Sequence, residues 1–277
     1  MRRRYRLKEL LQSTKEQLAS AGIPNPAREA QLLFCAYFNK DELWLITNQE
    51  SFIDADETFF SWLDRRAENE PFEYITKRVS FYSEEFYIDK GALIPRPETE
   101  LLIDEVLKNI EDKNAAVRIA EVGVGSGIIS IMLAKFLPNA EFIAVDISQE
   151  ALRVARKNIE KFGLRERIEL REGSLLEPVR ESIDYLVSNP PYIALDAPLE
   201  SNLSYEPQNA LFGGHIGDEI IKELLDAVLS REIKFFSCEM GYDQQDKIRN
   251  YLIDKKYKSL SFYKDYSDFD RGFTLKV

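Results

Sequence analysis

Hydrophobic positions in the first quarter of this 277-residue chain recur at helical spacing. Four short amphipathic runs fall between residues 7 and 67, and Gly22 with Pro24 separates the first from the second. The first run is the clearest, with apolar side chains at Leu7, Leu10, Leu11 and Leu18. The pattern predicts a small all-α domain over residues 1–71, which either completes a core or presents a docking face to a partner.

The pattern changes twice after these helices. Over residues 72–90 aromatic and β-branched side chains partly alternate, which predicts a β-hairpin linker. Buried strands and amphipathic helices then alternate through residues 91–277, as in a mostly parallel sheet with helices on both faces. The last two strand-like runs, 257–264 and 272–277, have no helix between them and predict an antiparallel hairpin at the sheet edge. The predicted fold class is α/β, preceded by the helical domain.

Charge narrows the choice of partners. The formal net charge is -11, whereas proteins that grip nucleic-acid backbones broadly rely on clustered lysine and arginine. The acidic balance argues against a nucleic-acid substrate and suits a basic protein partner. The basic start of the chain, residues 1–8, is interpreted as a solvated tail, with a local basic patch as the alternative.

Apolar runs and cysteine content indicate the cellular environment of the protein. No apolar run approaches the roughly 20 residues needed to span a bilayer, and the start lacks the apolar stretch of a signal peptide. We therefore expect no membrane association and a cytoplasmic location. Cys35 and Cys238 lie far apart and form no Cys-x-x-Cys pattern, so neither a disulfide framework nor a metal site is expected.

A glycine-rich turn follows the first predicted strand of the α/β region. Such glycines let the backbone approach a ligand, and the next helix offers free N–H groups. A dinucleotide-binding fingerprint would need another glycine where Ile128 stands, which weakens a nicotinamide reading. Asp146, 19 residues after Gly127 at the end of the next strand, is placed to accept hydrogen bonds from ribose hydroxyls. The pattern predicts a nucleoside site that includes Gly123, Val124, Gly125, Ser126 and Gly127.

A second candidate site is Asn189-Pro190-Pro191-Tyr192, which ends another apolar run. It combines a primary amide, two prolines that keep the peptide extended, and an aromatic ring. This combination suits a clamp for one planar NH2-bearing group. Taken alone, it is also compatible with a proline turn or a polyproline ligand.

The motifs together resemble class I S-adenosylmethionine-dependent methyltransferases that modify planar NH2 groups. Further segments select within that class: the chain is similar to the PrmC/HemK family of peptide chain release factor glutamine methyltransferases. The segments that carry this resemblance are Leu93 to Glu100, Tyr205 to Gly214, Glu239-Met240-Gly241, Lys264-Asp265 and Asp270-Arg271.

The resemblance implies N5-methylation of the glutamine in the Gly-Gly-Gln motif of class I peptide chain release factors. It implies that Asn189 Oδ1 and the Pro190 carbonyl each accept one amide N–H, while the Tyr192 ring stacks on the amide plane. Pro191, Glu206 and Pro207 are expected to shape the glutamine entry. No general base is needed before transfer, which fits a chain whose single histidine, His215, has no obvious partner.

The same resemblance implies S-adenosylmethionine as the cofactor. Residues 123–127 would cradle its methionine part, Asp146 its ribose, and Ser174 with Leu175 its adenine, while Asn189 adjoins the methyl group. The chain departs from the family where Ser174 replaces a frequent acidic residue. Glu121 also replaces a more usual aspartate.

Two alternatives stay open at this point. The Asn-Pro-Pro-Tyr chemistry also serves enzymes that methylate an exocyclic amine of DNA or RNA on a flipped base. A non-catalytic protein that binds release factors or ribosomes is the second, although such a scaffold has no need of Asn189 and Tyr192. We expect a monomer.

Overall fold

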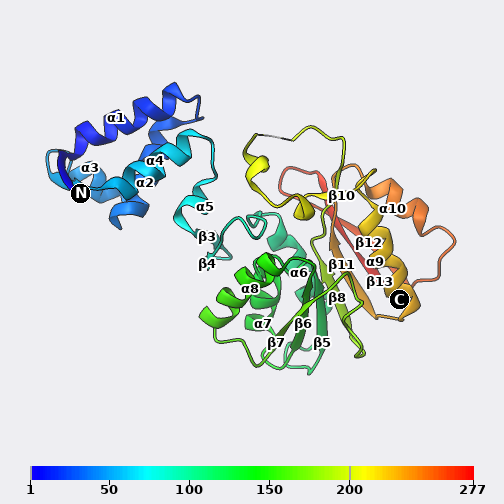
Figure 1. Cartoon of the computed structure of the whole chain (residues 1–277). Coiled ribbons are helices and arrows are strands. Elements are labelled where there is room, and N and C mark those ends of the chain that lie inside the picture. Colours follow the sequence, from blue (N-terminus) through cyan, green and yellow to red (C-terminus); the bar gives the residue numbers. More distant parts are fainter. Residues whose placement is uncertain (1, 200) are drawn as a thin grey trace. The chain divides into compact units, whose positions relative to one another are not determined.

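The computed structural model describes residues 2–199 and 201–277. The chain divides into two compact units (Figure 1). Residues 2–77 and 201–205 form the first unit, and residues 78–199 and 206–277 form the second. The first boundary therefore falls after Lys77, six residues beyond the predicted end of the helical domain.

The first unit is a helical bundle, as the hydrophobic spacing predicts. Asp41 and Asp56 begin two of its helices by accepting the backbone N–H groups of Trp44 and Thr58. Buried aromatic rings fill its core, and the ring centroids of Phe34 and Phe59 lie 5.0 Å apart, edge to face. Its helices are α1 (Leu7–Ser20), α2 (Pro26–Phe38), α3 (Glu42–Thr47), α4 (Glu57–Ala67) and α5 (Phe72–Thr76).

The expected solvated tail is wrong. Residues Arg3–Arg6 form strand β1, which pairs antiparallel with β2 (Phe52–Ala55). The guanidinium carbon of Arg4 lies 4.9 Å from the centroid of the Phe52 ring, a cation–π contact that shields part of this exposed ring. The strand escaped notice because its pairing partner lies about 49 residues along the chain, a separation that carries no local sequence signal.

The predicted hairpin over residues 72–90 is wrong at its start. Residues Phe72–Thr76 form α5, which begins after Pro71 and ends at Lys77 in the left-handed conformation (φ 62°). Pro71 stands at the N-cap with an extended ψ of 137°, where its missing N–H costs the helix no hydrogen bond. The hairpin itself is shorter, with β3 (Arg78–Phe81) paired to β4 (Glu84–Tyr87).

The second unit is built on a seven-stranded sheet with the order β12-β13-β11-β8-β5-β6-β7. The five strands from β11 to β7 are parallel, and β13 runs antiparallel to both β11 and β12, which confirms the predicted terminal hairpin. The strands are β5 (Arg118–Val122), β6 (Glu141–Asp146), β7 (Ile168–Glu172), β8 (Tyr185–Ser188), β11 (Phe235–Glu239), β12 (Ser259–Lys264) and β13 (Asp270–Lys276).

Helices cover both faces of this sheet (Figure 1). On one face α6 contacts α7, and α7 contacts α8. On the other face α9 and α10 bury Leu224, Leu225 and Ile248 in a core shared with the strands. These helices are α6 (Thr99–Asn109), α7 (Ile128–Phe136), α8 (Gln149–Lys161), α9 (Glu219–Ser230) and α10 (Gln245–Tyr251). Among the described residues, no helix is both long and apolar enough to cross a bilayer.

The strand order reverses between β5 and β8, because the chain first adds β6 and β7 on one side of β5 and then returns to the other. Ligands of open α/β sheets bind at such a switch point, beyond the carboxyl ends of the strands. The connection after β8 passes through β9 (Ile193–Ala194), which pairs with β10 (Phe212–Gly214), and through the 3₁₀ turns η1 (Ser201–Tyr205) and η2 (Gln208–Ala210).

Candidate active site

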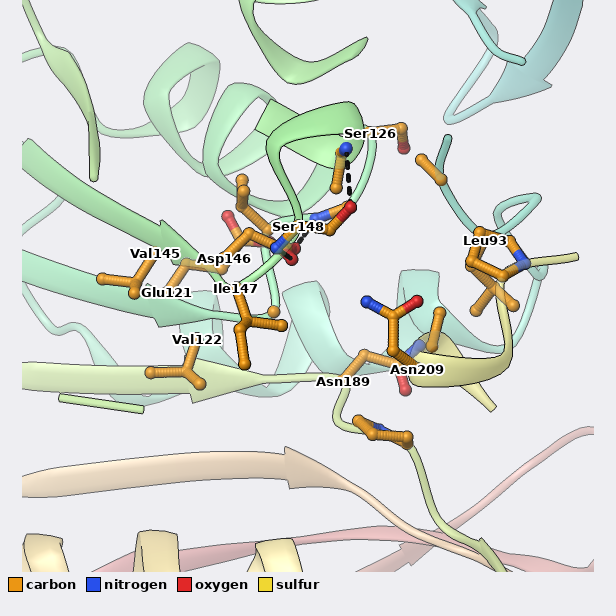
Figure 2. A pocket seen from close by; sticks show the side chains of 18 of the residues that line it. Leu93, Glu121, Val122, Ser126, Val145, Asp146, Ile147, Ser148, Asn189 and Asn209 are labelled. Carbon is orange, nitrogen blue, oxygen red and sulfur yellow. Dashed lines mark hydrogen bonds between the residues drawn. The ribbon is translucent and has the colours of Figure 1, made fainter. Parts of the chain in front are cut away.

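A cavity of about 290 Å³ lies in the second unit, where β5, β6 and β8 end (Figure 2). Backbone turns and side chains from several elements line it, including most residues that the sequence assigned to a site. Those residues are Gly123, Val124, Gly125, Ser126, Asp146, Ser174, Leu175, Asn189, Pro191 and Pro207. The structure therefore brings the glycine turn and the Asn-Pro-Pro-Tyr segment together at one cavity.

The glycine turn is held by the ends of two strands. The Gly123 amide donates to the Val145 carbonyl at 2.9 Å, and Gly123 adopts a φ of 76° that favours glycine. The Gly125 amide donates to Asp146 Oδ2 at 2.9 Å. From α8, Asn158 Nδ2 donates to the Ser126 carbonyl at 2.8 Å. These bonds fix the backbone on one side of the cavity before any ligand binds.

Asp146 has a structural task in addition to any ligand contact. Its Oδ1 accepts the Ser148 amide at 2.9 Å, while Oδ2 accepts Gly125. Each carboxylate oxygen carries two acceptor sites, so capacity remains for a further donor. Burial raises the pKa of Asp146, and the backbone donors oppose this shift. Ser148 caps α8 by accepting the Ala151 amide at 3.3 Å.

Glu121 brings a buried carboxyl group to the end of β5. Its Oε2 accepts the Ser130 amide at 2.9 Å and the Ser130 hydroxyl, whereas Oε1 makes no hydrogen bond to any residue that the structure describes. Burial, helped by the charge of Asp146, raises the pKa of Glu121 to about 8. A buried oxygen without a partner, in a residue that lines the cavity, fits a ligand carrying a donor or a cationic group.

The amide of Asn189 begins a chain of side-chain hydrogen bonds. Asn189 Nδ2 donates to Thr99 Oγ1 at 3.1 Å, and Thr99 Oγ1 donates to Glu239 Oε2 at 2.8 Å. The Tyr192 hydroxyl donates to the other oxygen, Glu239 Oε1, at 3.2 Å. Both functional ends of the Asn-Pro-Pro-Tyr motif therefore contact the same buried network.

Close backbone packing holds the Asn-Pro-Pro-Tyr loop in place. A Cβ atom on Gly213 would lie 2.4 Å from the Pro191 carbonyl oxygen, and one on Gly217 would lie 2.5 Å from that of Tyr192. Gln244 Nε2 donates to the Tyr192 carbonyl at 3.1 Å and to that of Gly217 at 3.0 Å. Only glycine fits at these two approaches.

Four residues assigned from the sequence lie outside the cavity lining. Gly127 caps α7, Pro190 is buried, and Tyr192 contacts Glu239. Glu206 is also buried, where its carboxylate accepts the Ile94 amide at 3.0 Å and pairs with Arg96. Its side chain is thus committed to the wall of the site, while Pro207 beside it lines the cavity.

The sequence reasoning missed Thr99, Glu239, Asn158 and Asn209. The side chain of Asn209 is drawn among those lining the cavity (Figure 2). Thr99 and Glu239 stand inside the two family-like segments, 93–100 and 239–241, which was the available signal. Their contact across 140 residues has no signature in either segment alone.

Comparisons with known proteins agree with this architecture. Residues 9–76 match the PrmC N-terminal domain, and residues 96–202 match the Methyltransferase small domain. The catalytic domain of human METTL16, solved with an RNA hairpin, superposes with a TM-score of 0.58 at 17% identity, covering 69% of this chain and 74% of that one. The fold and the site define a class I, S-adenosylmethionine-dependent methyltransferase.

Full-length relatives narrow the class to a family. A release factor glutamine methyltransferase of Clostridium acetobutylicum is 33% identical, with 88% of each chain covered. Its counterparts in Koribacter versatilis and Clostridium botulinum are 36% and 35% identical; the matches cover 90% and 96% of this chain and 91% and 97% of theirs. The chain belongs to the release factor glutamine methyltransferase family.

Proposed function

We propose that this protein methylates the side-chain nitrogen of the glutamine in the Gly-Gly-Gln motif of class I peptide chain release factors. The observation that carries the proposal is the Asn189 amide at the edge of the cavity. Its nitrogen is engaged by Thr99, so its oxygen is the atom left to accept a hydrogen bond. A fixed acceptor beside a nucleoside-type cavity suits the capture of a planar NH2 group.

The residues around the cavity fit S-adenosylmethionine. Glu121 offers an unpaired buried oxygen to the ammonium group, Asp146 has acceptor capacity for ribose hydroxyls, and the glycine turn leaves room for close approach. Ser174 and Leu175 line the part proposed for adenine, where Leu175 takes the left-handed conformation (φ 50°). When bound, the cofactor supplies an electrophilic methyl group on a sulfonium.

The protein's task is to orient a poor nucleophile. An amide nitrogen shares its lone pair with its carbonyl, so catalysis depends on holding the NH2 group in line and on favouring positive charge there. Asn189 Oδ1 and the Pro190 carbonyl each accept one N–H in this proposal. Two acceptors fix the direction of the nitrogen and favour the charge that develops on it.

Tyr192 completes the proposed amide clamp. Burial raises the pKa of Tyr192, and the nearby charge of Glu239 raises it further, so the phenol stays protonated and continues to donate. The bond to Glu239 fixes the position of the hydroxyl end of the ring. A ring held in this way can stack on the substrate amide and adds a cation–π contribution as charge develops.

The helical unit is proposed as the docking module for the release factor. The support is its match to the PrmC N-terminal domain and the acidic balance of the chain, which suits a basic partner. We also propose that the protein acts as a monomer. Light scattering of the purified protein checks the monomeric state.

Methyl transfer from labelled cofactor tests the proposed function. Three acceptors are offered in parallel: an intact class I release factor, its variant with alanine in place of the Gly-Gly-Gln glutamine, and double-stranded DNA. We expect label only in the intact factor. Label in DNA would favour exocyclic amine methylation, and label in the alanine variant would place the modified residue elsewhere.

A further inference from the structure

We propose that Glu239 is a positioning residue that sets the orientation of the Asn189 amide through Thr99 and holds the Tyr192 hydroxyl at the same time. This inference deepens the proposed function and rests on it for the identity of the substrate. It concerns residues that neither the glycine turn nor the Asn-Pro-Pro-Tyr motif contains.

The direction of the hydrogen bonds shows how Glu239 acts on the Asn189 amide. An ionised carboxylate only accepts, so the Thr99 hydroxyl must donate to Glu239 Oε2, at 2.8 Å. The hydroxyl proton of Thr99 is then engaged by Glu239, so Thr99 Oγ1 can only accept a further hydrogen bond. It accepts one from Asn189 Nδ2 at 3.1 Å. An amide whose nitrogen is held in this way cannot exchange its oxygen and nitrogen without losing the bond. The carboxylate thereby selects which Asn189 atom is available to the substrate.

The second step concerns the other end of the motif. Glu239 Oε1 accepts from the Tyr192 hydroxyl at 3.2 Å, so the two oxygens of one carboxylate serve the amide and the ring. The network joins three separate elements, because Thr99 begins α6, Glu239 ends β11, and Asn189 and Tyr192 follow β8. Thr99 and Glu239 are each 1% exposed, so the bond between them is shielded from bulk solvent.

Burial of an acidic group argues that Glu239 serves more than stability. A carboxylate removed from water is unfavourable unless its partners compensate, and an apolar residue would fill this position at less cost. Burial raises the pKa of Glu239 to about 7, opposed by Thr99, Arg271 and Tyr192 and assisted by Glu98. The buried Tyr263 and Cys238 also lie within its electrostatic reach. Protonation would add a donor to a network that needs two acceptors.

Glu239→Gln tests the proposal with a nearly isosteric change. Glutamine offers one acceptor and one donor group, so one of the two bonds must reverse or break. We expect kcat to fall roughly 30- to 100-fold, because a misoriented amide loses the aligned geometry. The Kd for S-adenosylmethionine should stay within about twofold, because the proposed contacts to its methionine, ribose and adenine parts come from Glu121, the glycine turn, Asp146, Ser174 and Leu175, which lie outside this network. Equal losses in kcat and cofactor affinity would point to a general distortion and overturn the proposal.

Further variants separate orientation from folding. Thr99→Val removes the hydroxyl that relays the orientation and should lower kcat as Glu239→Gln does, whereas Thr99→Ser should retain most of it. Ser237→Ala is the matched control, because Ser237 is buried on the same strand and its hydroxyl makes no hydrogen bond to the described residues. Full activity in Thr99→Val would overturn the relay even if Glu239→Gln failed to fold.

An NMR measurement gives a readout that does not depend on the release factor. The side-chain amide resonances of Asn189, assigned by their loss in Asn189→Asp, should shift with pH around the pKa of Glu239, near 7. The kcat of the wild type should rise through the same pH range as the carboxylate forms. The component near pH 7 should vanish from both profiles in Glu239→Gln, which leaves any change near pH 8 to Glu121, and its persistence would overturn the proposal. A wild type that titrates in this way but does not methylate a release factor would contradict only the proposed function.

Discussion

The two sides of the cavity are built in different ways. On the glycine-turn side, residues 123–127 and Asp146 are held mainly by backbone hydrogen bonds from neighbouring strand ends. On the Asn-Pro-Pro-Tyr side, side chains that are distant in sequence hold the loop, including Thr99, Glu239 and Gln244. A backbone-built site tolerates change at many side chains, whereas a site built from a side-chain network depends on each member.

The largest expected effect is on the Asn-Pro-Pro-Tyr side, where Asn189→Ala removes the proposed acceptor. We expect kcat to fall roughly 10²–10³-fold, the range seen when one fixed polar group that stabilises developing charge is removed. The Kd for S-adenosylmethionine, measured by calorimetry, should change less than about threefold.

Asn189→Asp provides a matched comparison, because it keeps the side-chain size but loses the N–H that Thr99 accepts. It should also lose most activity. A fully active alanine variant would remove Asn189 from the mechanism and would make the two sides of the cavity equally tolerant.

The loop's dependence on distant packing is tested at Gly213. An added Cβ would lie 2.4 Å from the Pro191 carbonyl oxygen and 2.6 Å from that of Gly217, so Gly213→Ala must displace the loop. We expect kcat/KM to fall about 100-fold, because a small shift of a loop that positions the substrate removes the aligned geometry needed for transfer.

Gly163→Ala is the control for that substitution. Gly163 has a positive φ of 69°, but a Cβ there meets no atom within 4 Å. Its cost should be confined to about 1 kcal/mol of stability from the backbone, with activity kept. Activity in Gly213→Ala equal to the control would mean that the loop adapts more freely than its packing indicates.

The difference between the two sides also explains what the sequence could predict. The sheet and the glycine turn follow from short-range patterns: buried strands alternate with helices, and Asp146 lies at the next strand end after the turn. The strand at Arg3–Arg6 and the contact between Thr99 and Glu239 depend on partners far along the chain. The aromatic and β-branched residues of Phe72–Thr76 favour a strand by local propensity, although the segment forms a helix after Pro71.

Glu121 is an exception to this difference between the two sides of the cavity, because it places a buried side chain on the glycine-turn side. Its pKa of about 8 in the folded protein lies above the ordinary value of 4.5. A raised carboxyl pKa means that the folded state binds the proton more tightly. The stability this contributes is fully present below pH 4.5 and is lost as pH rises through about 8.

We therefore expect Glu121 to lower the free energy of unfolding without cofactor by roughly 2–3 kcal/mol between pH 6 and pH 8, at about 1.4 kcal/mol per pH unit for one proton, in addition to the fall that the raised pKa of Glu239 contributes. Glu121→Gln should remove its share of this dependence, because the amide does not titrate, and should leave the share of Glu239. Urea unfolding at several pH values measures it. An equal slope in both proteins would show that Glu121 ionises in the folded state as freely as in the unfolded chain.

The smallest expected effect is that of Asp146→Asn, on the side where backbone bonds dominate. The asparagine side chain keeps one oxygen that accepts a hydrogen bond, but an NH2 group replaces the other oxygen. That NH2 group would face the backbone N–H of either Gly125 or Ser148, so one of these two bonds is lost. The turn keeps its bonds to Val145 and Asn158, so it should remain largely in place. We expect the Kd for S-adenosylmethionine to rise about tenfold, equivalent to one charge-assisted hydrogen bond of roughly 1.5 kcal/mol, with kcat at saturation nearly unchanged.

Asp184→Asn is the control, because Asp184 accepts the Arg118 amide at 3.0 Å at the start of β8, away from the cavity lining. A loss of kcat in Asp146→Asn as large as that in Glu239→Gln would mean that the two sides of the cavity are coupled during catalysis.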